Sequence, residues 1–113
     1  MSKEEMTLIE TQQRVDRFIS QFEEGYFSPL VMMARLTEEM GELAREINHH
    51  YGEKPKKSTE KEKSVKDELG DVYFVLVTLA NSLDIDLDEA FEISMSKIEH
   101  RDQNRWTKKE NQT

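Results

Sequence analysis

The sequence predicts an all-α protein with four main helices in a bundle. Apolar residues recur at helical spacing, and helix start and stop signals bracket the same segments. The only run that could form a buried strand has no second strand to pair with. At 113 residues the chain is long enough for one modest core, so we expect a single domain spanning residues 1–113.

The first two helices are marked by their ends. Apolar residues recur at roughly helical spacing from Glu4 to Glu23, and Gly25 ends that segment. Ser28 then has the position of an N-cap and is followed by a proline, which is tolerated at the first helical position. The second helix should therefore run from Pro29 to about His50, with Gly52 as its stop signal.

The local signals for the third helix are mixed. Residues 52–63 are rich in lysine and carry no large apolar side chain, so they are expected to form a solvated loop or a mobile flap. Ser64 can cap a helix that continues to about Leu83. Its segment Val72–Ala80 is rich in β-branched and aromatic residues, which also suits a buried strand. We favour helix because this run continues a helical pattern without a turn signal.

The fourth helix begins at a predicted capping box. Asp86, with Glu89 three residues later, opens a helix from Leu87 to about Arg101. The residues that follow are polar apart from Trp106, and residues 107–113 are expected to be a frayed tail.

The composition limits the classes of function. Hydrophobic residues make up only 35% of the chain, so we expect its core to be completed by other copies of the chain. The net charge of -8 argues against binding duplex nucleic acid through a general basic surface. There is no cysteine, which excludes disulfides and thiolate metal sites. No signal core or long apolar run is present, so we expect a cytoplasmic protein with no membrane partner.

One acidic motif occurs twice, as EEMGE at residues 38–42 and as DELGD at residues 67–71. Residues three apart share one face of a helix, so Glu39 points with Glu42 and Glu68 points with Asp71. If the two helices form an antiparallel hairpin, the two pairs can lie at the same height along the helix axes. Carboxylates 5 Å apart repel by roughly 3 kcal/mol at an effective dielectric of 20, so four together need a counter-charge. Oxygen ligands favour a hard cation, with Mg²⁺ preferred and Mn²⁺ as a substitute.

A solvated acidic face is the alternative, because acids are abundant and DEAFE at residues 88–92 repeats their spacing. The first two motifs each contain a glycine, which DEAFE lacks. An interior helical glycine costs about 1 kcal/mol relative to alanine. We therefore expect Gly41 and Gly70 to mark a close approach of the two helix backbones.

With these motifs the chain resembles the MazG-like nucleotide pyrophosphohydrolases of the all-α NTP pyrophosphatase superfamily. The family signature is E-E-x-x-E on one helix and E-x-x-D on the next, and the flanks ARLTEEMGELAREIN and KDELGDVYFVLVTLANSLDIDLDEAF also match. The resemblance covers about residues 27–106, taken as the domain core. It implies hydrolysis of an NTP or dNTP to monophosphate and pyrophosphate with Mg²⁺, as nucleotide-pool house-cleaning. It also implies a homodimer or homotetramer with intertwined helices.

The resemblance assigns roles to individual residues. It makes Glu39, Glu42, Glu68 and Asp71 the metal ligands. Glu38 or Glu39 would be the catalytic carboxylate that takes a proton from the attacking water. For substrate binding it implies Asn81, Lys97 and Arg101. On the residues alone, the two cations would instead be basic side chains favoured near a helix C-terminus.

Two rival readings remain open at the level of sequence. The first is a non-enzymatic, dimeric helical interaction module, whose acidic clusters hold a structural metal or none. The second is a phosphoribosyl-ATP pyrophosphatase, because those enzymes share the superfamily. The base, the sugar and the choice between normal and damaged nucleotides depend on a pocket that the sequence does not describe.

Overall fold

The computed structural model describes residues 5–52 and 64–110, which form four α-helices and no strand. They are α1 (Leu8–Ile19), α2 (Pro29–Tyr51), α3 (Val65–Ser82) and α4 (Leu87–Asp102). The predicted all-α class with four main helices is confirmed. The run from Val72 to Ala80 lies inside α3, so the choice of helix over strand was correct.

Side-chain caps start three of the helices where the sequence placed them. The Ser28 hydroxyl accepts from the backbone N–H of Val31, with proline at the first helical position of α2. Ser64 opens α3 through a capping box, and the Asp86 carboxylate accepts backbone N–H groups at the start of α4. The third and fourth helices therefore begin within a residue of the expected positions.

Helix α1 is shorter than expected at both ends. Thr7 and Glu10 form a capping box, so the helix begins at Leu8 rather than at Glu4. It ends at Ile19, and residues 20–24 form turns that lead to Gly25. Gly25 has φ = 61°, a left-handed conformation that glycine adopts without steric cost.

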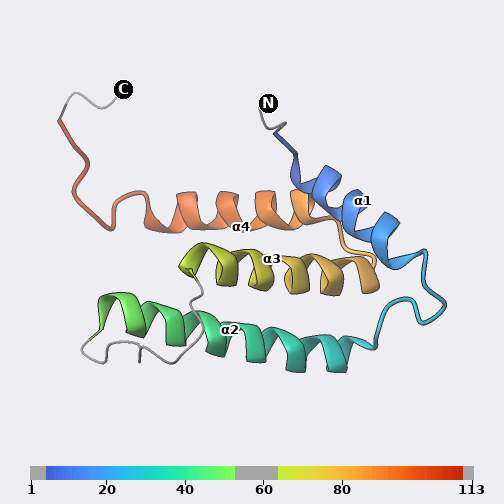
Figure 1. The fold of residues 1–113 in the computed structure, drawn as a ribbon. Coiled ribbons are helices and arrows are strands. Elements are labelled where there is room, and N and C mark those ends of the chain that lie inside the picture. The colour runs from blue at the N-terminus through green and yellow to red at the C-terminus, as the bar shows by residue number, and fades with distance from the viewer. Residues whose placement is uncertain (1–4, 53–63, 111–113) are drawn as a thin grey trace.

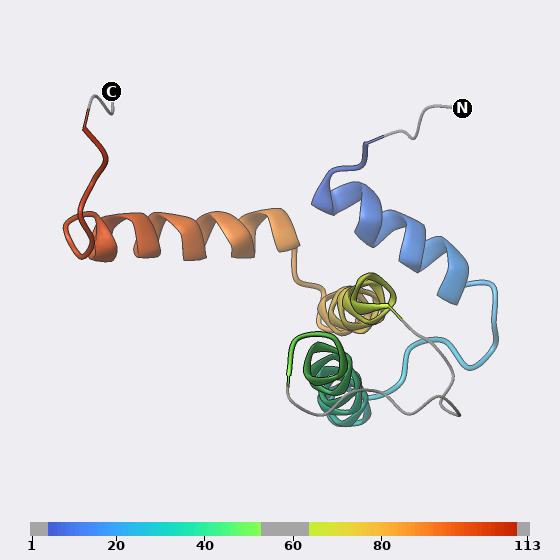
Figure 2. The ribbon, with the colours of Figure 1, turned by 60° about the vertical axis from the view of Figure 1, so that its left-hand side comes forward.

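The helices are arranged around an antiparallel α2–α3 hairpin (Figure 1). Helix α1 packs across α3, and α4 leaves the hairpin beside the start of α1 and projects away from it (Figure 2). The buried apolar core of the described residues is small and consists of Met32, Val75, Val77 and Ala80. No residue of α4 is buried in the described chain.

The remaining predictions concern the loop before α3, the C-terminal tail and membrane-spanning helices. The predicted lysine-rich loop falls almost entirely in residues 53–63, outside the described residues. Helix α4 ends at Asp102, and residues 103–110 are not helical. Across the two described ranges, every helix is too short or too polar to cross a bilayer.

Candidate metal centre

Three acidic side chains converge where α2 faces α3. Glu39 and Glu42 come from α2 and Glu68 from the first turn of α3. One carboxylate oxygen of each residue lies within 4.8 Å of the other two. We call these three residues the carboxylate cluster. Glu68 is 1% exposed and Glu42 is exposed, so the cluster leads from the interior of the hairpin to solvent.

The cluster raises the pKa of the Glu39 carboxyl group. Burial contributes most, followed by Glu42, and the charges of Asp71 and Glu68 add to the effect. Glu39 Oε2 is also buried, and no hydrogen-bond partner for it lies within the described residues. A buried carboxylate oxygen in this state is costly, and a bound cation is one way to satisfy it.

The donor set suits a hard divalent cation. All three groups offer carboxylate oxygens, the ligands that Mg²⁺, Mn²⁺ and Ca²⁺ prefer. Two oxygens that share one ion are separated by at most twice the metal–oxygen distance, about 4.2 Å for Mg²⁺ and about 5 Å for Ca²⁺. The three oxygens lie within 4.8 Å of one another, so binding one ion would require the side chains to close around it.

The other two predicted acidic residues lie beside the cluster. Asp71 is half-buried on α3, one turn after Glu68, and is close enough for its charge to raise the pKa of Glu39. Glu38 is exposed on α2 next to Glu39. Three of the four predicted metal ligands thus come together directly, and the fourth borders them. Their role as ligands stays a prediction.

The expectation for the two glycines was wrong. A Cβ atom added at Gly41 or Gly70 would meet nothing within 4 Å among the described residues. Each glycine directly precedes an acid of the motif, so it lies about 100° further round the helix and faces away from the hairpin contact. The helices do not need these glycines to approach each other within one chain.

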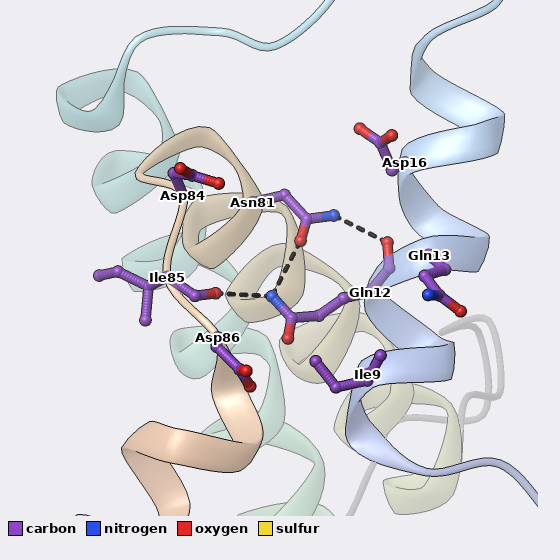
Figure 3. A pocket seen from close by; sticks show the side chains of 8 residues that line it. All are labelled: Ile9, Gln12, Gln13, Asp16, Asn81, Asp84, Ile85 and Asp86. Atoms are coloured by element: carbon purple, nitrogen blue, oxygen red, sulfur yellow. Dashed lines mark hydrogen bonds between the residues drawn. The ribbon is translucent and has the colours of Figure 1, made fainter.

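Asn81 lies at the opposite end of α3 from the cluster, ten residues or about 15 Å after Asp71. Figure 3 shows its amide in a polar cavity of about 380 Å³ between α1 and the start of α4. Its Nδ2 donates to the backbone O of Gln12 and to the Tyr26 hydroxyl, both at 3.0 Å. Its Oδ1 accepts from Gln12 Nε2 at 3.0 Å. In the single chain, Asn81 therefore joins α1 to α3.

Gln12 is a buried polar residue that sequence reasoning missed. Its Nε2 also donates to the backbone O of Ile85 at 2.7 Å, and its Oε1 accepts from the N–H of Leu87 at 2.9 Å. One side chain thus connects α1, the end of α3 and the start of α4. No local signal could identify it, because its partners lie about 70 residues away along the chain.

Lys97 and Arg101 are exposed on α4, the helix that projects away from the hairpin (Figure 2). Arg101 donates two hydrogen bonds to the neighbouring Asp102 carboxylate, at 3.0 and 3.1 Å, which lower the pKa of Asp102. One chain therefore does not bring these cations to its own carboxylate cluster. Their role in substrate binding stays a prediction.

Fold and site together define an all-α protein in which an antiparallel helix pair carries a carboxylate cluster that fits a hard cation. The model of the MazG nucleotide pyrophosphohydrolase domain matches residues 27–106. The chain therefore belongs to the MazG nucleotide pyrophosphohydrolase family.

Similar proteins agree with this assignment. The uncharacterised protein YpjD of Bacillus subtilis strain 168 is 66% identical over 104 residues, which cover 92% of this chain and 94% of YpjD. A crystal structure of YpjD from Bacillus subtilis, named there as a candidate pyrophosphatase, matches with a TM-score of 0.76 and 65% identity. That match covers 84% of this chain and 97% of the other.

A second solved structure carries a more specific description. It is the Bacillus-conserved MazG protein, a nucleotide pyrophosphohydrolase, with a TM-score of 0.74 and 50% identity. The match covers 97% of this chain and all of the other. Family and structural relatives together support a hydrolase that acts on the pyrophosphate linkage of a nucleotide. The family is generally metal-dependent, in keeping with the acidic cluster.

Proposed function

We propose that this protein is a Mg²⁺-dependent nucleoside triphosphate pyrophosphohydrolase, which converts an NTP or dNTP to its monophosphate and pyrophosphate. Its role would be to remove unwanted or surplus nucleotides. The observation that carries the proposal is the convergence of Glu39, Glu42 and Glu68 from two helices onto one small volume. Mn²⁺ would be a workable substitute, because it takes the same oxygen ligands.

In this proposal the cluster and Asp71 hold the ion. A bound Mg²⁺ would offset charge on the phosphate oxygens and make a bound water more acidic. A carboxylate oxygen that the ion leaves uncoordinated would accept the proton, and Glu39, which belongs to the cluster, is one candidate. Glu38, exposed beside it, is the second candidate.

We propose further that the working form is a homodimer or homotetramer. Phe91 and Ile93 on α4 are 57% and 61% exposed, and a single chain leaves the whole helix without buried residues. Apolar surface of this kind is typical of an interface between subunits. The α4 of a second copy would then supply Lys97 and Arg101 to phosphates held at the cluster. Asn81 would contact the nucleotide from the end of α3.

The test is turnover of a panel of NTPs and dNTPs with Mg²⁺, scored for monophosphate and pyrophosphate. Glu42→Gln and Asp71→Asn should each lower kcat/KM by roughly 100-fold or more, because each removes a proposed metal ligand. Glu92→Gln is the matched control, since Glu92 is exposed on α4 and belongs to the third acidic motif. Full turnover by the two ligand variants would contradict the assignment.

The non-enzymatic alternative, a dimeric helical interaction module, is favoured by the same exposed apolar residues of α4. It predicts that the chain associates and binds a metal but turns over no nucleotide of the panel. Light scattering of the purified protein, run beside the turnover assay, separates the two. Association without turnover would support the interaction module.

A further inference from the structure

An apolar cavity of about 330 Å³ lies at the end of the α2–α3 hairpin where α1 and the turns after it approach. Four of the chain's five phenylalanines line it, namely Phe18, Phe22, Phe27 and Phe74. The Phe18 and Phe22 rings meet edge to face, with centroids 5.3 Å apart. These rings are between 38% and 53% exposed, so the cavity wall is aromatic surface that the fold leaves partly open.

Helix geometry relates the cavity to the carboxylate cluster. Arg35 lines the cavity from α2, and Glu42 lies seven residues, or two helical turns, further along that helix. Thr78 lines it from α3, seven residues after Asp71. Residues seven apart lie within about 20° of one another on a helix. Each helix therefore presents its cavity residue and its acid on one stripe, about 10 Å apart along the axis.

Because α2 and α3 are antiparallel (Figure 1), both stripes lead from the acids to the same end of the hairpin. On α2 the stripe leads from the acids towards the N-terminus, and on α3 it leads towards the C-terminus. Both directions reach the end of the hairpin that α1 covers, at the right of Figure 1. The aromatic cavity therefore lies about 10 Å from the carboxylate cluster along the axes of the same two helices.

We propose that the aromatic cavity binds the base and sugar of the nucleotide whose phosphates lie at the carboxylate cluster. This inference rests on the proposed function. Aromatic side chains stack on nucleobases, and a separation of about 10 Å leaves room for the sugar and the first phosphate between base and ion. At about 330 Å³ the cavity is at the small end for ligand sites, which suits part of a nucleotide rather than all of it.

Two polar groups in the wall would contribute to base or sugar selection. Arg35 is a pure hydrogen-bond donor. The Thr78 hydroxyl donates to the backbone O of Phe74 at 2.8 Å, so towards a ligand its oxygen can act only as an acceptor. Thr78 is buried and is therefore a fixed part of the wall. Arg35 and Thr78 thus offer one donor and one acceptor to the edge of a ligand, in a wall that also includes Glu24 and Tyr26.

The kinetic test compares two exposed aromatic residues, one inside the cavity and one outside. Phe18 is 53% exposed and lines the cavity, whereas Tyr51 is 79% exposed and lies at the far end of α2 from the cavity. Phe18→Ala should raise KM about tenfold for the best nucleotide, leave kcat nearly unchanged and reduce the difference between bases. Phe18→Leu provides a milder variant if the alanine variant folds poorly. An equal KM change in Tyr51→Ala would overturn the proposal.

A second test needs neither metal nor turnover. The probes are the eight common ribonucleosides and deoxyribonucleosides, which carry no phosphate and so do not depend on the carboxylate cluster. Methyl NMR signals of Ile19 and Met32, which line the cavity, should shift on adding at least one nucleoside, while the signal of Ile98 on α4 stays unchanged. Signals that respond only to protein concentration would show a second copy filling the cavity and would overturn the proposal.

The two tests also separate this inference from the proposed activity. Nucleoside-dependent shifts of Ile19 and Met32 without turnover of any triphosphate would leave the cavity assignment standing and contradict the hydrolase. Turnover that is insensitive to Phe18→Ala, without nucleoside-dependent shifts, would contradict the cavity assignment alone.

Discussion

Neutralising Glu39 should stabilise the metal-free protein and weaken its response to Mg²⁺. Glu39→Gln keeps the shape of the side chain and removes one negative charge from the carboxylate cluster. In the wild type this charge is held against Glu42 and Glu68, with a carboxylate oxygen of each within 4.8 Å. Folding brings these like charges together, so part of the folding free energy is lost to their repulsion.

The size of the effect follows from this distance. Two unit charges 4.8 Å apart repel by about 3.5 kcal/mol at an effective dielectric of 20. Glu42 is exposed and Glu39 is half-buried, so solvent and salt screen much of this energy. We expect Glu39→Gln to raise the free energy of unfolding of the metal-free protein by roughly 1–3 kcal/mol. Wild-type protein should gain about 2.7 kcal/mol from Mg²⁺ at 100 times its Kd, and the variant clearly less.

The assay is urea unfolding followed by circular dichroism, with EDTA or with saturating Mg²⁺. Glu38→Gln is the matched control, since it makes the same chemical change at an exposed neighbour outside the cluster. The control should respond to Mg²⁺ like the wild type. The reasoning is refuted if Glu39→Gln is less stable than the wild type in EDTA and gains as much from Mg²⁺.

Three further predictions test the fold. Burial first, and then the hydrogen bond to Asp16, raise the pKa of Tyr26 from 10.0 to about 12. Folding therefore favours the neutral form of Tyr26, and the free energy of unfolding should fall by up to roughly 2–3 kcal/mol as the pH rises from about 10 to about 12. Urea unfolding at several pH values measures this fall, and Tyr26→Phe should abolish it. Gly41→Ala and Gly70→Ala should each raise the free energy of unfolding by up to about 1 kcal/mol, because alanine favours the helix and its Cβ meets no neighbour among the described residues. The measurement is a higher Tm, and a lower Tm would reveal a neighbour packed at the glycine. Gln12→Ala should lower the free energy of unfolding by about 2–4 kcal/mol in denaturant, because it leaves several buried partners without hydrogen bonds. An equal loss in a Gln13→Ala control would contradict this reason.

Most helix boundaries were predictable because their causes are local. Ser28 with its proline, Ser64 and Asp86 act on backbone groups within three residues, so they start α2, α3 and α4 in almost any context. The error at α1 came from the same rule, since Thr7 and Glu10 form a capping box that periodicity alone does not reveal.

The candidate site was predictable in part. Helical spacing alone places Glu39 with Glu42 on one face and Glu68 with Asp71 on another. Their convergence depends on the antiparallel packing and register of α2 against α3. The sequence is compatible with this packing but does not specify it. The glycine argument failed at this step, because a conformational cost at Gly41 does not say which side of the helix is crowded.

The sequence by itself determined the all-α class, most of the helix starts and the acidic motifs, since each depends on residues close together in the chain. Tertiary structure decided how those elements meet. It buried Gln12 among partners about 70 residues away, turned α4 away from the hairpin and left an aromatic cavity in line with the carboxylate cluster. Such contacts depend on packing between distant segments, which no local pattern records.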